Sequence, residues 1–148
     1  MYEFLEYRVK DVMTSDFVSV RPDTRLSEAE KIFEEHDFNS LPVLSKKGKL
    51  VGWFTKLDLL SAFCSDDDHM FPPYEEIMKQ PVSRFMSREI RSVTPLAPLT
   101  RVIEKLVSRK CKSFPVVDSN DELVGVVARE DVLRGLRSAA EGITAPVE

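Results

Sequence analysis

The sequence predicts a mixed α/β (α+β) fold made of two copies of one βαββα unit. Three observations predict it: an internal repeat, apolar residues that recur first at helix and then at strand spacing, and a globular composition. The chain has 148 residues, of which 43% are hydrophobic and 31% charged. These values are typical of a soluble globular protein with one compact domain or two very small ones.

The internal repeat is the strongest of these observations. Shifted by 73 positions, the sequence aligns with itself without gaps from Val9–Leu60 onto Val82–Leu133, and 14 of the 52 aligned positions are identical. The identical pairs include Met13/Met86, Pro22/Pro95, Gly52/Gly125 and Asp58/Asp131. An ungapped match of this length indicates that the two halves share one fold.

Each copy is expected to open on a short extended piece that ends before a proline, Phe17–Val20 and Ile90–Val93. An amphipathic helix follows, because apolar residues recur at helical spacing. In the first copy they are Leu26, Ala29, Ile32 and Phe33, and in the second Leu99, Val102, Ile103, Leu106 and Val107.

Two apolar strands joined by a polar turn then predict a β-hairpin in each copy. The strands are residues 40–44 and 50–54 in the first copy, and residues 113–117 and 123–127 in the second. A final helix closes each copy, from Lys56 to Phe63 and from Arg129 to Leu136.

A unit of roughly 50 residues buries too little apolar surface to be stable alone. We therefore expect the two copies to pack sheet to sheet about a pseudo-twofold axis, with one pocket per copy in the cleft at that axis. The expected boundaries are 1–66 for an N-terminal helix and the first repeat, 67–81 for a linker with a short helix, and 82–148 for the second repeat and a C-terminal tail.

The charge balance and the apolar runs exclude several kinds of partner. The net charge is -4, from 21 basic and 25 acidic residues, so we expect neither nucleic acid nor an anionic membrane as a partner. No apolar run approaches the ~20 residues of a membrane span, and the first residues do not resemble a signal peptide. A cytoplasmic location is expected, and the two cysteines, without CxxC spacing, are expected to be reduced.

The strongest local motif is Gly52-Trp53-Phe54-Thr55-Lys56-Leu57-Asp58, where a strand turns into a helix. The Thr55 hydroxyl and the free N–H groups of the helix start suit a phosphate, and a carboxylate at Asp58 can accept bonds from a sugar diol. Thr-x-x-Asp is also a helix-capping motif, which is the better interpretation of these four residues alone. In the second copy Ala128 cannot cap, yet Asp131 remains, so we expect Asp131 to serve a ligand.

The tandem βαββα units, the Ser-x-Pro-Val strands and the Gly-x-x-Thr-x-x-Asp turn resemble a pair of CBS domains (the cystathionine-β-synthase repeat), together called a Bateman module. The resemblance covers about Val9 to Leu136. It implies a regulatory module that binds adenosine compounds, commonly AMP, ADP, ATP or S-adenosylmethionine, and passes the bound state to a partner protein.

The resemblance also implies residue roles. Asp58 and Asp131 would hold ribose hydroxyls, and Thr55 a phosphate; Ala128 departs from the pattern, and Arg129 could substitute for its missing hydroxyl. The implied walls of the base pocket are Ser19, Val20, Ser92 and Val93 on one side and Ser40, Pro42, Ser113 and Pro115 on the other. Each wall residue is equally well explained as ordinary core or strand. Lys56 and Pro22 complete the predicted ligand-binding set.

The remaining signals are weaker. Asp66-Asp67-Asp68-His69 is better explained as a solvated loop than as a metal site, because neighbouring side chains point apart. No catalytic motif is present and the chain has no room for a second domain, so we expect no enzymatic activity and no metal.

Three functional hypotheses stay open. They are an adenine-nucleotide sensor, a ligand-free structural module for dimerisation and assembly, and a binder of another anion or cofactor such as S-adenosylmethionine. The Ala128 position mildly favours the last for the second copy. CBS pairs often associate into a disc of four repeats, so a homodimer is expected, with a separate effector protein of unknown identity. The candidate dimer surface comprises Leu59, Leu60, Phe63, Leu133 and Leu136.

Overall fold

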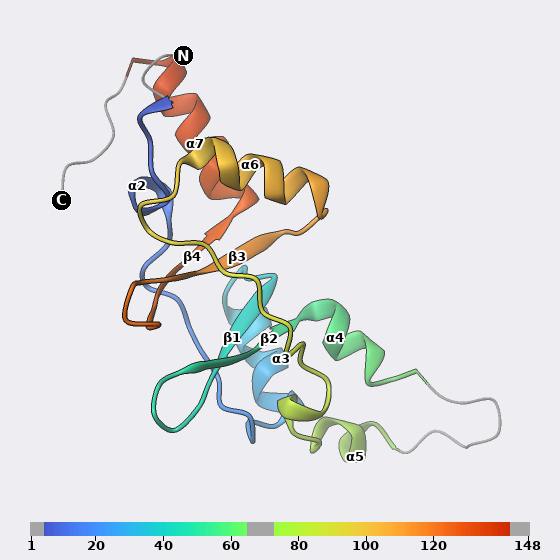
Figure 1. The fold of residues 1–148 in the computed structure, drawn as a ribbon. Coiled ribbons are helices and arrows are strands. Elements are labelled where there is room, and N and C mark those ends of the chain that lie inside the picture. Colours follow the sequence, from blue (N-terminus) through green and yellow to red (C-terminus); the bar gives the residue numbers. More distant parts are fainter. Residues whose placement is uncertain (1–4, 65–72, 143–148) are drawn as a thin grey trace. The chain divides into compact units, whose positions relative to one another are not determined.

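The computed structural model describes residues 5–64 and 73–142 and divides the chain into two compact units. Unit 1 holds the described residues of Met1–Phe17 together with those of Arg91–Glu148, and unit 2 holds those of Val18–Ile90. Each unit contains a two-stranded antiparallel sheet with helices beside it (Figure 1). None of the helices among these residues is long and apolar enough to cross a membrane.

Unit 2 is built around the hairpin of β1 (Ser40–Leu44) and β2 (Leu50–Thr55), as the sequence predicts. The helices are α3 (Leu26–Glu35), α4 (Lys56–Ser61) and α5 (Tyr74–Met78), with a 3-10 turn η1 at Val82–Arg84. Apolar residues of α3 and both strands form the core, because their helical and alternating spacing places them on one side. The fully buried members of this core include Leu26, Ala29, Leu41, Val43 and Phe54.

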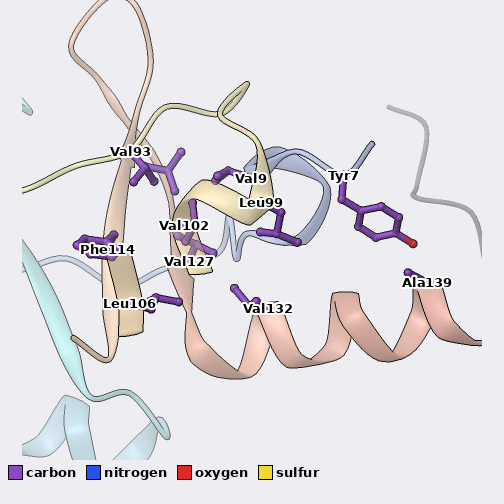
Figure 2. Close-up of a cluster of buried hydrophobic side chains, with 11 residues drawn as sticks. Tyr7, Val9, Val93, Leu99, Val102, Leu106, Phe114, Val127, Val132 and Ala139 are labelled. Atoms are coloured by element: carbon purple, nitrogen blue, oxygen red, sulfur yellow. The ribbon is translucent and has the colours of Figure 1, made fainter. Parts of the chain in front are cut away.

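Unit 1 repeats this arrangement 73 residues later. Its hairpin is β3 (Ser113–Val117) with β4 (Leu123–Ala128), and its helices are α2 (Val9–Val12), α6 (Leu99–Ser108) and α7 (Arg129–Ala140). The core in Figure 2 joins residues of α6, α7 and both strands to Tyr7 and Val9 near the start of the chain. Even the hairpin turns correspond, because Gly48 and its counterpart Asp121 both have positive φ, 80° and 62°.

The predicted opening strands are much shorter than expected. Instead of strands at Phe17–Val20 and Ile90–Val93, only Val20 and Val93 pair with a strand, each through one parallel bridge, to Val43 and Val116. The pairing does not continue past Val20 because the chain turns there: the N–H of Thr24 donates to the carbonyl of Arg21 at 3.0 Å. The repeat is therefore closer to bridge-α-β-β-α.

The closing helices differ from the predicted lengths in opposite directions. Helix α4 ends at Ser61, two residues before the expected Phe63, whereas α7 continues to Ala140, four residues past the expected Leu136. The last turns of α7 have packing partners, because Ala139 is buried in the same cluster as Tyr7 (Figure 2).

The opening segment of each copy pairs with the sheet of the other copy. Thr14 and Val126 exchange two backbone hydrogen bonds, of 2.8 and 2.9 Å, and Trp53 and Ser87 exchange two of 2.9 Å. The compact units therefore cut across the boundaries 1–66 and 82–148 expected from the linear repeat.

The two aligned glycines make this edge pairing possible. A Cβ added to Gly52 would lie 2.3 Å from the sulfur of Met86, and one added to Gly125 would lie 2.8 Å from the sulfur of Met13. The identical glycines and methionines of the repeat are therefore explained by one contact: the methionine of each opening segment packs directly against the glycine of the strand beside it, where a larger residue would not fit.

Candidate ligand site at the strand-to-helix turns

In the first copy, Thr55 and Asp58 form a complete capping box at the start of α4. The Thr55 hydroxyl accepts the Asp58 N–H at 3.1 Å, and one Asp58 carboxylate oxygen accepts the Thr55 N–H at 2.9 Å. The box forms because β2 ends directly at Thr55, whose extended backbone leaves the first helical N–H groups without partners. The capping interpretation of Thr-x-x-Asp is thus correct for this copy.

Capping does not use all the bonding capacity of these two side chains. The Thr55 hydroxyl still has a hydrogen to donate, and Asp58 is half-buried with a second oxygen that no hydrogen bond within the described residues engages. A carboxylate oxygen accepts bonds from a sugar hydroxyl, and a hydroxyl donates to a phosphate or carbonyl oxygen. The turn can therefore cap its helix and hold a polar ligand at once.

In the second copy, Asp131 is engaged by three partners within unit 1. One carboxylate oxygen accepts the Ala128 N–H at 2.7 Å; the other accepts a hydrogen bond from Arg134 at 2.6 Å and one from the Thr14 hydroxyl at 3.3 Å. The carboxylate is 7% exposed. The expectation that Asp131 has little structural use without a capping residue was therefore wrong, because it still closes half of the box and anchors two further side chains.

Arg134 and Thr14 are the residues near this site that the sequence analysis missed. Arg134 lies three positions after Asp131, a spacing that brings two side chains together on a helix, so the sequence did contain that signal. The aligned residue in the first copy is Ser61, whose hydroxyl donates to the Asp58 carbonyl at 2.6 Å and brings no positive charge. Thr14 is 117 residues from Asp131 in the chain, and no local pattern relates them.

The predicted wall residues divide into two connected groups. In the first copy Ser40 is the cross-strand partner of Thr55, and the Val20 N–H donates to the Pro42 carbonyl at 2.9 Å. Val20 and Pro42 are buried, so they contribute to the core, whereas Ser19 is exposed. Pro22 borders a separate hollow of about 690 Å³ with Arg21, Asp23, Ser45 and Lys46.

The wall residues of the second copy show the same arrangement. Ser113 is the cross-strand partner of Ala128, and the Val93 N–H donates to the Pro115 carbonyl at 3.0 Å. Val93, Ser113 and Pro115 are buried, and Ser92 is exposed.

Lys56 and Arg129 are the exposed first residues of α4 and α7, and each lines a groove of its unit. The Lys56 ammonium lies 5.9 Å from the centroid of the Phe33 ring, and the Arg129 Nε donates to the Cys111 carbonyl at 2.8 Å. The structure brings neither of them into hydrogen-bond contact with the carboxylate two residues later. Groove one, between α3 and α4, has a volume of about 570 Å³ and is lined by Glu30, Phe33, Glu34, Lys56, Leu59, Leu60 and Phe63. Groove two, between α6 and α7, has a volume of about 310 Å³ and is lined by Ile103, Leu106, Val107, Lys110, Arg129, Val132, Leu133 and Leu136.

The other ionisable side chains were compared with what a metal-ion site requires. Within residues 5–64 and 73–142, no three His, Cys, Asp or Glu side chains gather as a metal-ion site would require. Asp66-Asp67-Asp68-His69 lies outside the described residues. The pKa of the Tyr74 hydroxyl is raised by partial desolvation and by Glu30, whose carboxylate accepts its hydrogen bond at 3.3 Å.

Comparison with known proteins identifies the family to which the repeated unit belongs. The family model described as CBS domain matches this chain twice, at residues 9–65 and 82–138. The CBS domain-containing protein YhcV of Bacillus subtilis is 30% identical over 125 residues, which cover 84% of this chain and 81% of that protein. An uncharacterised 17.7 kDa protein of Acidianus ambivalens is 26% identical over 129 residues, 87% of this chain and 73% of that protein.

The chain also resembles a part of longer proteins and a solved CBS domain pair. The chain matches only 23% of the length of a homoserine O-acetyltransferase of Methanohalobium evestigatum and 22% of an L-aspartate semialdehyde sulfurtransferase of Methanocaldococcus jannaschii. The crystal structure of the CBS domain pair of protein MJ0100, in complex with 5'-methylthioadenosine and S-adenosyl-L-methionine, superposes with a TM-score of 0.74 at 26% identity, over 90% of this chain and 98% of that one. The chain belongs to the CBS-domain family and carries two copies of the domain.

Proposed function

We propose that this chain is a regulatory module that binds an adenosine-containing compound at its first copy and passes the bound state to a partner protein. The observation that carries the proposal is the contrast between Asp58 and Asp131. Asp58 keeps one carboxylate oxygen for a ribose hydroxyl beside a Thr55 hydroxyl that can donate. Asp131 has both oxygens engaged by its own unit.

The ligand class follows from the related pair. The CBS domain pair of MJ0100 is 26% identical to this chain, and its two ligands share an adenosine group. The Thr55 hydroxyl favours a ligand with an oxygen-bearing group at the other end of the sugar, so AMP, ADP and ATP are the first candidates and S-adenosylmethionine the next. A regulatory role is supported by the family assignment, because both repeats of this chain match the CBS domain.

The substitution Asp58→Asn tests the proposal without removing the helix cap. Asparagine keeps one oxygen to accept the Thr55 N–H, but it replaces the free oxygen with a donor group. Thermal unfolding is measured with AMP, ADP, ATP, S-adenosylmethionine and 5'-methylthioadenosine. A ligand at ~100 times its dissociation constant stabilises the native state by about 2.7 kcal/mol, or roughly 5–10 °C for a chain of this size.

We expect Asp58→Asn to abolish the ligand-dependent shift and to leave the ligand-free melting temperature almost unchanged. Asp131→Asn is the matched control, the same change at the aligned position of the second copy, and it should leave the ligand shift intact. A shift that survives Asp58→Asn and disappears in Asp131→Asn would place the binding site in the second copy instead.

A second candidate function is a ligand-free assembly module. The observation in its favour is the exposure of large apolar side chains on the helices, with Leu60 66% and Leu133 64% exposed. The absence of any shift across the whole ligand panel would favour this function over sensing.

A further inference from the structure

Unit 2 contains a hollow that is lined by residues of two turns, one directly after Val20 and one between β1 and β2. The turns lie close together because Val20 is bridged to β1: its N–H donates to the Pro42 carbonyl at 2.9 Å, and its carbonyl accepts the Leu44 N–H at 2.8 Å. This turn hollow has a volume of about 690 Å³ and is lined by Arg21, Pro22, Asp23, Ser45 and Lys46. Small-molecule sites span roughly 300–1,000 Å³, so its volume suits a small ligand.

Hydrogen bonds hold the backbone of both turns. In the first turn, the Arg21 N–H donates to the Thr24 hydroxyl at 2.9 Å, and the Thr24 N–H donates to the Arg21 carbonyl at 3.0 Å. In the second turn, the Ser45 N–H donates to the Lys49 carbonyl at 2.8 Å, and the Ser45 hydroxyl accepts the Lys49 N–H at 3.2 Å. That bond uses only the hydroxyl oxygen, so the hydroxyl hydrogen of Ser45 can be donated to a ligand.

Positive charge gathers at the turn hollow. Arg21 and Lys46 line it and are exposed, and neither side chain has a hydrogen-bond or ion-pair partner in the described part of the chain. Lys47 and Lys49 belong to the same hairpin turn, and Asp23 is the one carboxylate among the lining residues. Four cations therefore face one carboxylate. Guanidinium and ammonium groups without a protein partner are suited to bind phosphate oxygens.

The second copy forms its hairpin turn without a cation at any of the aligned positions. The residues aligned with Arg21, Lys46, Lys47 and Lys49 are Thr94, Ser119, Asn120 and Glu122. The turn is closed in the same way nonetheless, because Asp118 replaces Ser45 and accepts the Glu122 N–H at 3.0 Å. The fold therefore does not require positive charge at these four positions.

We propose that the turn hollow binds the di- or triphosphate group of a small molecule. The planar Arg21 guanidinium can hold two oxygens of one phosphate, Lys46 adds a second positive charge, and Ser45 adds a neutral donor. Several neighbouring cations attract a multiply charged anion more strongly than a singly charged one. None of the described residues that line the hollow is aromatic, so we expect the phosphate chain to be recognised rather than a base.

Isothermal titration calorimetry of the full chain with sodium tripolyphosphate, in low salt and without divalent cations, tests this site. Arg21→Thr and Lys46→Ser are the informative variants, because each introduces the residue that the second copy carries at the aligned position and should leave the fold intact. We expect each variant to raise the dissociation constant about tenfold, as the loss of a charged hydrogen bond does. Orthophosphate should bind the native chain more weakly than tripolyphosphate.

Two further variants distinguish a site from a diffuse attraction of anions. Lys31→Ala removes a charge from an exposed position of α3 that does not line the turn hollow, and it should change the dissociation constant by less than about twofold. Asp23→Asn removes the opposing carboxylate and should tighten binding about threefold. Equal losses in Lys31→Ala and Arg21→Thr would overturn the proposal, as would the absence of tripolyphosphate binding. Weaker binding in Asp23→Asn would also overturn it.

The inference does not depend on the adenosine ligand proposed above, because Thr55 lies at the opposite end of β2 from the hairpin turn. Asp58→Asn should leave tripolyphosphate binding unchanged. Arg21→Thr should leave the thermal shift with 5'-methylthioadenosine unchanged, since that compound has no phosphate. Loss of tripolyphosphate binding in Asp58→Asn would move the phosphate site to the strand-to-helix turn and overturn the proposal. In the Asp58→Asn chain ATP and tripolyphosphate should bind equally well, and much tighter binding of ATP would contradict recognition of the phosphate chain alone.

Discussion

The Arg134–Asp131 pair is expected to keep the second copy from binding a ligand, and Arg134→Ala should release it. In the native chain the Arg134 guanidinium donates at 2.6 Å to the carboxylate oxygen that corresponds to the free oxygen of Asp58. Removing the arginine leaves only the Thr14 hydroxyl, at 3.3 Å, on that oxygen. A ribose hydroxyl can then compete for it, so the number of adenosine ligands bound per chain should rise from one to two.

The stability change should be small. Arg134 is 57% exposed on its side chain and lies three residues from Asp131, so water screens the pair and its loss costs about 0.5–1 kcal/mol. That lowers the melting temperature by roughly 1–4 °C. Asp131 keeps its bond to the Ala128 N–H, at 2.7 Å, and with it the start of α7.

Isothermal titration calorimetry measures the stoichiometry directly, with 5'-methylthioadenosine and with AMP. The second copy lacks the threonine hydroxyl, so its new site should accept methylthioadenosine better than AMP. Arg137→Ala is the control, because it removes the same charge from an exposed position of the same helix without a side-chain hydrogen bond in the described part of the chain. Two ligands per native chain, or one ligand per chain in Arg134→Ala, would refute the reasoning.

Two further substitutions test the turns and the edge pairing. Thr55→Ala should cost about 1 kcal/mol through loss of the helix cap and should weaken AMP far more than 5'-methylthioadenosine; equal losses in calorimetry would remove Thr55 from phosphate binding. Gly125→Ala would place a Cβ 3.0 Å from the Thr14 carbonyl oxygen, which cannot move without breaking its bond to Val126. We expect a loss of about 1–3 kcal/mol in urea unfolding, and a smaller loss for Gly52→Ala, whose three nearest contacts are all atoms of the flexible Met86 side chain.

The regular elements could be predicted because their signal is local. Leu26, Ala29 and Phe33 show helical spacing within eight residues, and the structure buries all three on one face of α3. The Ser-x-Pro-Val strands and their polar turns are equally local, and both hairpins form where expected. The extent of the opening strands was wrong because a strand needs a partner along its length, which the local sequence does not show; in the structure only the last residue of each, Val20 and Val93, has a strand partner, Val43 and Val116.

The contacts around the candidate site could be predicted only in part, because Asp58 and Asp131 have different neighbouring residues in the two copies. Identity at Asp58 and Asp131 suggested equal roles, but Arg134 replaces Ser61 one helical turn later and changes what the carboxylate can accept. A comparison of the two turns together with the residues three positions after each aspartate would have detected this difference. The Thr14 contact could not have been detected from the sequence, since it depends on whether the opening segment pairs with the sheet of its own copy or with that of the other copy.

Because each opening segment pairs with the sheet of the other copy, we expect only fragments that contain both partners to fold. Four of the eleven buried residues in the core of unit 2, Ile77, Met78, Val82 and Met86, come from the segment that precedes or opens the second copy. At about 1.5–3 kcal/mol for each buried side chain, their loss costs roughly 6–12 kcal/mol, as much as the whole stability of a typical domain. A fragment of residues 18–90 should therefore unfold cooperatively in urea, whereas a fragment of residues 1–66, which follows the linear repeat, should be unfolded in circular dichroism. A folded 1–66 fragment would mean that the first copy can use its own opening segment at the edge of β2, and that the exchange between copies is not needed for stability.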